Sequence, residues 1–527
     1  MEAFAELLNR LSYTPGRNAK LGLMAQYFRR QPDPVRGWAL AALTDGLPFS
    51  FPVRRTIQTL MAGRVDEQLF RLSRDYVGDT AETVALLWPE PSAAARAPRL
   101  SEVVAELELA GRDQLAELVE GWLDRLDANG RWALLKLLTG ALRVGVSARL
   151  AKLSLAEAWQ RDVGEIEEIW HALSPPYEPL FGWLDGKADR PDISQVPVFR
   201  PLMLAHPLED DDLERLDLAD FSLEWKWDGI RVQLVAKAGE TRIYSRTGDD
   251  IGQSFPELVA SYCFDAVVDG ELLVLRDGKA APFQDLQQRL NRKSVSAKML
   301  EAYPAHVRLY DVLEVCGRDL RQEPFEARRQ ILEQWHAERL PARTDLSEII
   351  AVQDKAALRE LWSETRSSAI EGLMLKRRTS PYLAGRPKGH WFKWKRAPLT
   401  LDCVLMYAQR GSGRRSSYYS DYTFGAWRKG EDGGDELVPV GKAYSGYSDD
   451  ELMQLDRWVR ANTVERFGPV RSVAPGIVLE VAFDSVHRSK RHKSGVAMRF
   501  PRIHRIRWDK PVGDADWLET VVGMISD

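Results

Sequence analysis

The sequence contains only three cysteines among 527 residues, and they lie far apart. Cys263, Cys316 and Cys403 show no C-x-x-C spacing, so we expect neither a disulfide framework nor a four-cysteine zinc site. Sparse, unpaired cysteine is typical of a protein that is kept in a reducing compartment. We therefore predict a cytoplasmic protein, associated with the nucleoid if its source is bacterial.

Long apolar runs are also missing. No stretch of about 18 apolar residues occurs, and the first 20 residues carry early charges, so we expect no membrane span, no signal peptide and no membrane partner. The Gly-Lys pairs that begin at positions 186, 278 and 441 are each followed by alanine, which argues against the Walker A motif of P-loop ATPases. The net charge of -4 excludes a uniformly basic protein but allows local basic faces.

The chain divides into three regions of different composition. Residues 1 to about 172 show apolar residues at helical spacing and predict an all-α region, and the proline-rich stretch 173–210 predicts a linker. Strand patterns mixed with helical pieces then predict an α+β domain built on antiparallel sheets. From about 398, short strands at 401–407, 422–427 and 477–483 and a helix near 449–463 predict a small β-barrel. We set the domain boundaries at 1–198, 199–397 and 398–527.

The segment Glu224-Trp225-Lys226-Trp227-Asp228-Gly229-Ile230-Arg231 carries the strongest chemical signal. Lys226 lies mid-strand between two tryptophans, and a lysine with aromatic walls can lose its proton and act as a nucleophile. The Asp-Gly pair predicts a tight turn that returns Arg231 to the side of Lys226. On this segment alone, a surface hairpin with a snorkelling lysine is an open alternative.

Three later segments also place charged residues among apolar ones. Ser245-Arg246-Thr247-Gly248 predicts a turn with a projecting arginine, for which an ordinary surface turn is the alternative. Asp269-Gly270-Glu271 puts Glu271 inside an apolar strand, where a carboxylate is costly unless it is paired or binds a ligand. In the strand 370–376, Glu371 suits a divalent metal or a ribose, with a cross-strand ion pair as the alternative.

A fourth such segment is Trp391-Phe392-Lys393-Trp394-Lys395. Lys393 and Lys395 project from one strand face, while the aromatic residues cover the other. Two adjacent ammonium groups repel each other unless an anion lies between them, and a phosphate is the natural partner. The alternative is an amphipathic edge strand guarded by lysines.

In this order and spacing, the motifs Lys-x-Asp-Gly-x-Arg, Asp-Gly-Glu, Glu-Gly-x-x-x-Lys and Trp-x-Lys-x-Lys resemble those of ATP-dependent DNA ligases, especially the bacterial and archaeal enzymes. The resemblance runs from about 201 to 510. It implies an all-α DNA-binding domain, an α+β nucleotidyltransferase domain with ATP-grasp-like antiparallel sheets, and an OB-fold β-barrel. It also implies an enzyme of DNA repair, replication or recombination that seals nicks in duplex DNA with ATP and Mg²⁺ (or Mn²⁺), as a monomer that encircles the DNA.

The resemblance further implies a role for each matching residue. Lys226 would attack the α-phosphate of ATP and carry AMP, and Glu224 would face the adenine. Glu271 would hold a ribose hydroxyl and, with Glu371, a metal ion. Further nucleotide contacts would come from Arg231, Arg246, Tyr310, Lys393 and Lys395, with Arg231 and Arg246 also facing the 5′-phosphate of the nick. Tyr310 occupies a place where the family usually has phenylalanine, and it keeps the flat face that stacks on adenine.

Two further places in the sequence are implied to contact the nucleotide. The family often has an arginine six residues before the first lysine of the last motif, where this chain has Pro387, so a shift by one position makes Arg386 the candidate. Arg499-Phe500-Pro501-Arg502 resembles the C-terminal motif that orients the leaving pyrophosphate. It lies among nine basic residues and a single acid, Asp509, between positions 488 and 510, a pattern typical of polyphosphate or DNA-backbone contact. A solvated basic face is the alternative.

The helical region resembles the DNA-binding domain of the family at residues 137–147. There Gly140 and Gly145 would let helices and the DNA backbone approach closely, and Arg143 would face a phosphate. A packed helix pair is the alternative for this stretch, and both can hold together.

Two kinds of rival function stay open. An RNA ligase or an RNA-capping guanylyltransferase would share the covalent lysine chemistry, but the long helical region before Lys226 favours the DNA enzyme. An NAD-dependent ligase is disfavoured because three scattered cysteines cannot form its zinc finger. A non-catalytic DNA-binding protein on a ligase scaffold is the rival from another class. The presence of Lys226, Glu271, Glu371, Lys393 and Lys395 argues against it.

Overall fold

The computed structural model describes residues 1–47, 53–77, 79–90, 96–111, 113–140, 142–292, 294–364, 369–395, 398–411, 418–430, 432–490 and 492–525. Arg491, one of the nine basic residues noted above, lies outside them, as does Ala141. The chain forms two compact units, of which one comprises Met1–Arg161, Pro175–Asp185 and Pro398–Asp527, and the other Asp162–Ser174 and Gly186–Ala397. The three domain boundaries proposed from the sequence stay a prediction.

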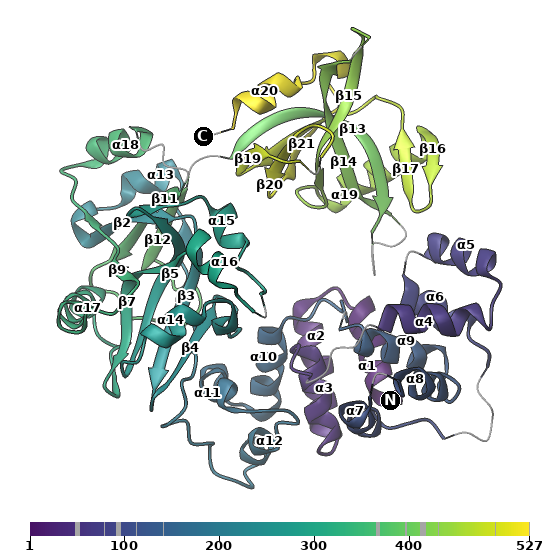
Figure 1. The fold of residues 1–527 in the computed structure, drawn as a ribbon, viewed down its shortest axis with the longest axis horizontal. Coiled ribbons are helices and arrows are strands. Elements are labelled where there is room, and N and C mark those ends of the chain that lie inside the picture. The colour runs from purple at the N-terminus through teal and green to yellow at the C-terminus, as the bar shows by residue number, and fades with distance from the viewer. Residues whose placement is uncertain are drawn as a thin grey trace. The chain divides into compact units, whose positions relative to one another are not determined.

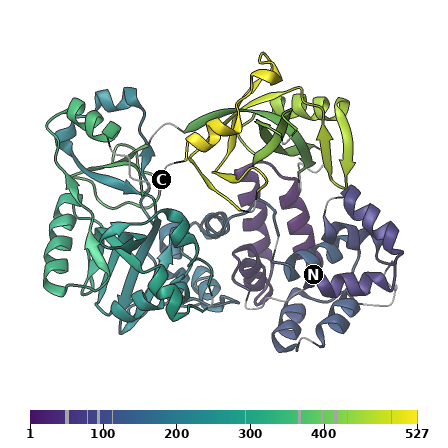
Figure 2. The same cartoon turned by 45° about the horizontal axis from the view of Figure 1, so that its top comes forward.

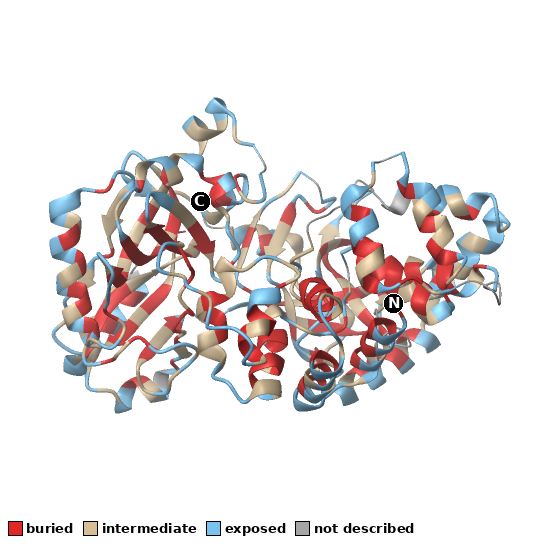
Figure 3. Cartoon of the chain, turned by 90° about the horizontal axis from the view of Figure 1, so that it is seen from below, coloured by how far each residue is buried: buried red, intermediate tan, exposed pale blue. Residues whose placement is uncertain are grey.

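The N-terminal region is helical, as predicted (Figure 1). Apolar side chains of its helices are buried, for example Leu134, Leu135 and Leu138 of α9, and Figure 3 shows buried positions among exposed ones along helices. Side-chain caps begin several of them, including Ser147 at α10. The helices are α1 (Glu2–Tyr13), α2 (Arg17–Arg30), α3 (Val35–Leu43), α4 (Val53–Ala62), α5 (Glu67–Val77), α6 (Thr80–Leu87), α7 (Leu100–Leu109), α8 (Leu115–Leu123), α9 (Ala128–Leu138) and α10 (Ala148–Trp159).

The proline-rich stretch expected to be a linker contains a helix, α12 (Glu178–Leu184). Pro179 lies in its first turn, where the missing N–H has no intrahelical partner to lose, so the prolines of this stretch do not prevent a helix there. Upstream, α11 (Val163–Ile169) and the 3-10 helix η1 (Trp170–Ala172) belong to the second unit.

Two sheets form the centre of the second unit (Figure 2). The five-stranded sheet has the order β1-β12-β11-β2-β10, and the seven-stranded sheet runs β4-β3-β5-β7-β8 with β6 on β5 and β9 on β7. Pairing is antiparallel, as predicted, except for β1 with β12 and β7 with β9. The strands are β1 (His206–Pro207), β2 (Phe221–Trp227), β3 (Ile230–Lys237), β4 (Glu240–Ser245), β5 (Ala266–Arg276), β6 (Lys279–Ala280), β7 (Ala305–Val315), β8 (Arg318–Asp319), β9 (Thr344–Leu346), β10 (Ile349–Ile350), β11 (Ile370–Arg377) and β12 (Trp391–Lys395).

Three apolar clusters hold these sheets in layers. One cluster joins the two sheets and contains Met203, Val267 and Trp391. The other two lie on the outer faces, where α13 (Asp210–Arg215) and α18 (Lys355–Glu364) cover the five-stranded sheet, and α14 (Pro256–Ser261) and α17 (Phe325–Arg339) cover the seven-stranded sheet. Short helices α15 (Phe283–Gln287) and α16 (Ala297–Ala302) complete this unit. Polar side chains between the sheets therefore lie in a narrow layer with apolar surroundings.

The connection between β2 and β3 differs from the predicted hairpin. The two strands belong to different sheets, so Asp228 and Gly229 carry the chain from one sheet to the other rather than back along the same one. Gly229 passes so close to β5 that a Cβ there would lie 2.5 Å from the carbonyl oxygen of Leu272. An Asp-Gly pair favours a hairpin by its local conformational preference. Here the glycine is needed because a side chain would clash where the chain passes from one sheet to the other.

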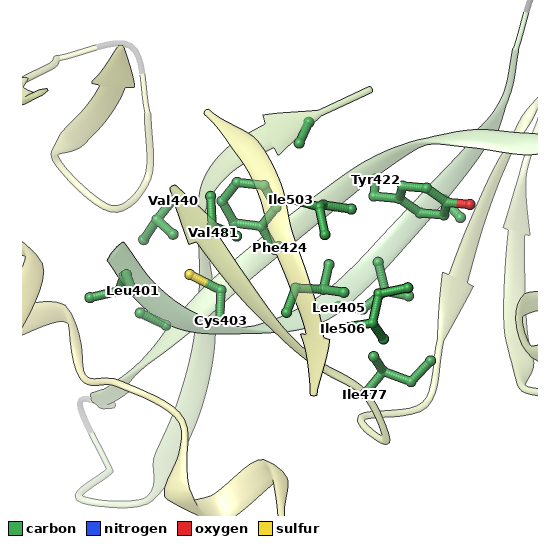
Figure 4. Close-up of a cluster of buried hydrophobic side chains, with 14 of the residues drawn as sticks. Leu401, Cys403, Leu405, Tyr422, Phe424, Val440, Ile477, Val481, Ile503 and Ile506 are labelled. Carbon is green, nitrogen blue, oxygen red and sulfur yellow. The ribbon is translucent and has the colours of Figure 1, made fainter. Parts of the chain in front are cut away.

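The C-terminal region is a curled sheet around one apolar core, shown in Figure 4. The predicted strands and helix are confirmed as β13, β14, β18 and α19. β13 is long and pairs with β14, β17 and β18, which curls the sheet about side chains such as Leu405, Phe424 and Val481. The elements are β13 (Leu399–Arg410), β14 (Tyr419–Lys429), β15 (Asp435–Ala443), α19 (Asp449–Ala461), β16 (Thr463–Phe467), β17 (Val470–Val473), β18 (Val478–Phe483), β19 (Ser485–Arg488), β20 (Val496–Arg499), β21 (Arg502–Arg507) and α20 (Leu518–Gly523).

Among the residues described, no helix combines the length and the apolar character that crossing a bilayer requires.

The crossing at Gly229 gives a stability prediction. Gly229→Ala should lower the free energy of unfolding of this unit by about 1–3 kcal/mol, because its methyl group meets backbone that cannot move aside. Thermal unfolding followed by circular dichroism measures the loss. Gly22→Ala is the matched control, since Gly22 lies in α2 with no atom within 4 Å of the new Cβ, and it should be neutral or stabilising. Equal melting temperatures for Gly229→Ala and the parent would contradict the steric account.

Candidate active site

Lys226 lies on β2 beside β11 and reaches into the layer between the sheets. Its Nζ donates a hydrogen bond to Oε1 of Glu371, and Nζ of Lys395 donates to Oε2 of the same carboxylate at 2.5 Å. Gly372 lies between these two lysines in the strand register and is opposite both of them. A Cβ at Gly372 would lie 2.5 Å from the carbonyl oxygen of Trp394, so only glycine lets the three strands come together here.

The carboxylate of Glu371 is held in its charged form. Burial alone would raise its pKa, but the ammonium groups of Lys226 and Lys395 keep the pKa of Glu371 below its usual range. The predicted alternative for this strand, a cross-strand ion pair, is therefore present. It joins the residues expected to bind the nucleotide.

Further cations gather around Lys393. Burial and the nearby charges of Lys395, Lys226, Arg386 and Arg246 lower the pKa of Lys393. The structure thus brings together five predicted contacts, from β2, β12, the β4 turn and the segment before β12. Such a group of like charges is unfavourable without an anion, and a polyphosphate fits its charge and size.

Glu271 is a second carboxyl group near Lys226. Burial raises its pKa to about 7, with Lys226 and Arg231 opposing this effect and Glu371 and Asp228 adding to it. Its strand neighbour is Arg231, directly opposite on β3. A carboxyl group that titrates near neutral pH beside a second, ionised carboxylate is typical of a functional site.

Glu224 lies deeper in the same layer and is 2% exposed. Its Oε1 forms an ion pair at 2.8 Å with Nζ of Lys376, which is also 2% exposed. The ammonium group of Lys376 lies 4.2 Å from the ring centroid of Tyr310 and 4.9 Å from that of Trp391. These side chains form a buried cluster in which a charged pair lies against aromatic rings.

Arg231 binds protein groups through both terminal nitrogens of its guanidinium. Its guanidinium donates to the carbonyl of Met203 at 2.6 Å, to Oδ2 of Asp269 at 2.6 Å and to the hydroxyl of Tyr382 at 2.9 Å. Asp269 is fully buried and also accepts hydrogen bonds from Tyr382 and Gln233. Arg231 is therefore fixed in orientation before any ligand arrives.

Sequence reasoning assigned no role to Lys376, Asp269 or Tyr382. Two of these carried a signal, since Asp269 begins the Asp-Gly-Glu motif and Lys376 ends Glu-Gly-x-x-x-Lys. Tyr382 had none, because it lies in a loop and reaches Asp269 only through the fold.

The two tryptophans beside Lys226 have separate places. Trp225 packs on the outer apolar cluster of the five-stranded sheet. The ring of Trp227 lies under the guanidinium of Arg308, 4.2 Å from its centroid. Trp225 thus packs behind the strand that carries Lys226.

Three predicted contacts belong to the other unit. Arg143 is exposed in the loop before α10. Arg499 ends β20 with its guanidinium 5.2 Å from the Phe500 ring centroid, and Arg502 begins β21 with an ion pair to Asp484 at 3.3 Å.

Comparison with known proteins decides the family. Residues 202–395 match the family model described as ATP dependent DNA ligase domain, and residues 415–510 match the ATP dependent DNA ligase C terminal region. The chain is 33% identical to a probable DNA ligase of Anaeromyxobacter sp. (strain Fw109-5), over 92% of this chain and 93% of that protein. The chain belongs to the ATP-dependent DNA ligase family. This confirms the resemblance seen in the motifs and the predicted enzyme class, whose general mechanism passes through a lysine-AMP intermediate.

Other relatives match most or nearly all of the chain. A probable DNA ligase of Koribacter versatilis is 34% identical over 78% of this chain and 74% of that protein. DNA ligase 1 of Korarchaeum cryptofilum is 29% identical over 99% of this chain and 97% of that protein. The solved structure of Pmar-Lig_PreS3 covers 96% of this chain and 99% of its own, with a TM-score of 0.59 and 17% identity, which supports a shared fold.

The raised pKa of Glu271 predicts a pH-dependent cost in this ligase. Since folding raises that pKa from 4.5 to about 7, the folded state binds the proton more tightly, and stability is lost as the pH rises through 7. Glu271→Gln should therefore raise the free energy of unfolding, by about 2 kcal/mol more near pH 8.5 than near pH 5.5. Denaturant unfolding at both pH values, without ATP or metal, measures the difference.

Glu371→Gln is the control with the opposite sign. Its pKa is lowered, so its charge stabilises the fold above the ordinary carboxyl pKa, and its removal should destabilise the protein at pH 8.5. The same pH trend in both variants would rule out the electrostatic assignment.

Proposed function

We propose that this ligase seals nicks in duplex DNA with Lys226 as the residue that carries AMP. The observation that supports this most directly is the group of cations around Lys226, which shares a single carboxylate, Glu371. Anions must be brought together in every step of joining a nick, and charge neutralisation with positioning supplies most of the acceleration in such transfers.

In the first step, the neutral Nζ of Lys226 attacks the α-phosphorus of ATP. A P–N bond forms, the P–O bond to pyrophosphate breaks, and the lysine proton is lost. Glu371, which already accepts a hydrogen bond from this Nζ, is placed to receive the proton. Lys393 and Lys395 stabilise the charge that builds on the α-phosphate oxygens.

The adenine is proposed to enter the pocket of Tyr310 and Trp391. Glu224 at its base would accept a hydrogen bond from the exocyclic amine, and Tyr310 would stack on the ring. Lys376 forms an ion pair with Glu224 in this buried place.

A divalent metal ion fits the carboxyl groups that are present. Glu271 and Glu371 offer hard oxygen ligands in one partly buried place, and the described residues contain no group of three or more acidic, histidine or cysteine ligands. Mg²⁺ commonly takes one or two carboxylates and completes its shell with water and substrate phosphates. When bound, it would neutralise phosphate charge and compete with Lys226 for Glu371.

The later steps use the same cations. The 5′-phosphate of the nick attacks the lysine-bound AMP, which breaks the P–N bond and leaves AMP joined to the DNA end through a new P–O–P link. The 3′-hydroxyl then attacks that 5′-phosphate, and AMP leaves. Arg246, exposed at the end of β4, is the proposed contact for the nick phosphate, and Glu271 for the ribose.

The remaining sequence predictions concern the C-terminal region, further nucleotide contacts and DNA binding. We infer that the C-terminal region is an OB-fold, with Arg499 and Arg502 orienting the pyrophosphate. Arg143 contacts the DNA backbone. Arg231 and Arg386 also face the nucleotide. The protein acts as a monomer that encircles the duplex.

Loss of the nucleophile gives the decisive test. With α-labelled ATP and magnesium, the parent protein should acquire a covalent label and Lys226→Ala should acquire none, since Lys226 is the proposed attacking amine. Lys279→Ala, on an exposed turn strand, is the matched control and should label normally. No label on the parent would refute the catalytic assignment, and labelling from GTP or NAD in preference to ATP would favour a rival nucleotidyltransferase.

The ion pair of Glu224 and Lys376 at the proposed adenine site gives a second test. Lys376→Met leaves the carboxylate of Glu224 buried without its cation and disturbs the group that is proposed to accept from adenine. The KM for ATP in the labelling reaction should rise about 10-fold or more, consistent with about 1–3 kcal/mol for an unsatisfied buried charge partner. The melting temperature should also fall, because removing one partner of a buried ion pair leaves an uncompensated charge. An unchanged KM would mean that this pair serves the fold alone.

A further inference from the structure

Lys20, in the first turn of α2, is a buried cation with unusual partners. It is 9% exposed, and its Nζ donates hydrogen bonds to the carbonyl oxygens of Val144 at 2.5 Å and Gly145 at 3.2 Å. Burial lowers the pKa of Lys20, and no carboxylate among the described residues forms an ion pair with it. A buried ammonium group without an acidic partner is costly for a fold, so its retention calls for a reason outside folding.

Lys136 shows the ordinary solution in the same helical region. It is 8% exposed and forms an ion pair with Asp79 at 2.5 Å, which neutralises its charge. Lys20 has no such carboxylate partner. Its ammonium group donates instead to two backbone carbonyl groups of the loop between α9 and α10. That loop contains Arg143, the proposed DNA-backbone contact.

The backbone of this loop is held in a strained form. Gly140, Arg143 and Gly145 all have φ in the left-handed region, at 62°, 49° and 66°. Arg143 is the one without glycine's freedom, and such a conformation persists only when its surroundings fix it. Burial of Val144, which is 4% exposed, and the bonds to Lys20 supply that fixation.

The carbonyl directions determine where the amides point. In a planar trans peptide the C=O and the following N–H point in opposite directions. Because the carbonyls of Val144 and Gly145 face Lys20, the N–H groups of Gly145 and Val146 face away from it. No hydrogen bond within the described chain uses either of these N–H groups. A cation on the carbonyl side also polarises each peptide and strengthens its N–H as a donor.

We propose that Lys20 is a positioning residue for DNA binding. It turns the carbonyls of Val144 and Gly145 inward, so that the N–H groups of Gly145 and Val146 and the side chain of Arg143 together meet a phosphate of the DNA backbone. This rests on the DNA contact proposed above for Arg143. It adds that the contact is built by a lysine more than a hundred residues away, which itself does not touch the DNA.

Gly145 connects the lysine to the loop. A Cβ at Gly145 would lie 2.5 Å from Nζ of Lys20, so an alanine there would push the ammonium group off the carbonyls. Gly145→Ala and Lys20→Met therefore break the same arrangement from its two sides, and their effects should not add.

The test is binding of the full chain to a nicked duplex without a 5′-phosphate, in the absence of ATP, at several salt concentrations. Lys20→Met should weaken binding about 5- to 10-fold, as expected for one lost set of backbone contacts, with little change in the slope of log affinity against log salt. Arg143→Ala should weaken binding and lower that slope by about one unit. Labelling of Lys226 by ATP, which needs no DNA, should be unchanged in Lys20→Met and reports that the variant is folded.

Lys136→Met is the matched control. It removes another buried lysine, so it should lower the melting temperature through the unpaired Asp79 and leave the affinity of the folded protein for DNA unchanged. A double-mutant cycle between Lys20→Met and Gly145→Ala should show that the double variant binds no more weakly than the weaker single variant.

Three outcomes would overturn the proposal, and they differ. Normal DNA affinity in Lys20→Met, with weakened binding in Arg143→Ala, removes the role of Lys20 and keeps the DNA contact. Normal affinity in Arg143→Ala removes the proposed contact and this inference with it. A slope lowered by about one unit in Lys20→Met means that Lys20 binds a phosphate itself.

Discussion

One carboxylate, Glu371, accepts hydrogen bonds from two lysines that approach from neighbouring strands on either side of it. Around it gather Lys393, Arg246 and Arg386, so this part of the layer holds more cations than the two lysines that bind the carboxylate directly. An excess of positive charge attracts anions such as phosphates. Gly372 is what lets the strands come close enough for the sharing.

A second network consists of direct hydrogen bonds between protein groups. Asp269, without exposure to solvent, accepts hydrogen bonds from Arg231, Tyr382 and Gln233. Buried hydrogen-bond networks favour a single arrangement of their members. Arg231 is therefore held in place by the protein, although its sequence motif alone did not distinguish it from the lysines around Glu371.

The sequence was most informative where local pattern and chemistry coincide. The strand of Lys226 alternates between apolar and polar residues, Lys393 and Lys395 alternate with Trp394, and Glu271 interrupts an apolar strand, so their grouping followed from period and motif order. It failed where distant contacts decide. The Asp228-Gly229 pair has a hairpin's local preferences but joins two sheets, and α12 forms in a stretch whose prolines suggested a linker. Lys20 and Tyr382 gave no signal because their partners lie more than a hundred residues away. Lys376 was visible in its motif, yet its pairing with Glu224 needed the register of β2 and β11.

The crossing at Asp228 and Gly229 has a mechanical consequence. Only two residues separate the last residue of β2 from the first of β3, so three Cα–Cα steps of about 3.8 Å limit the distance between those strand ends to roughly 11 Å. Lys226 lies one residue before the end of β2 and Arg231 one residue after the start of β3, so both lie next to this short connection. Any movement of one sheet against the other is therefore smallest near these two residues. With Lys226 as the proposed AMP carrier, the connection keeps it and Arg231 close together while substrates of very different size are bound.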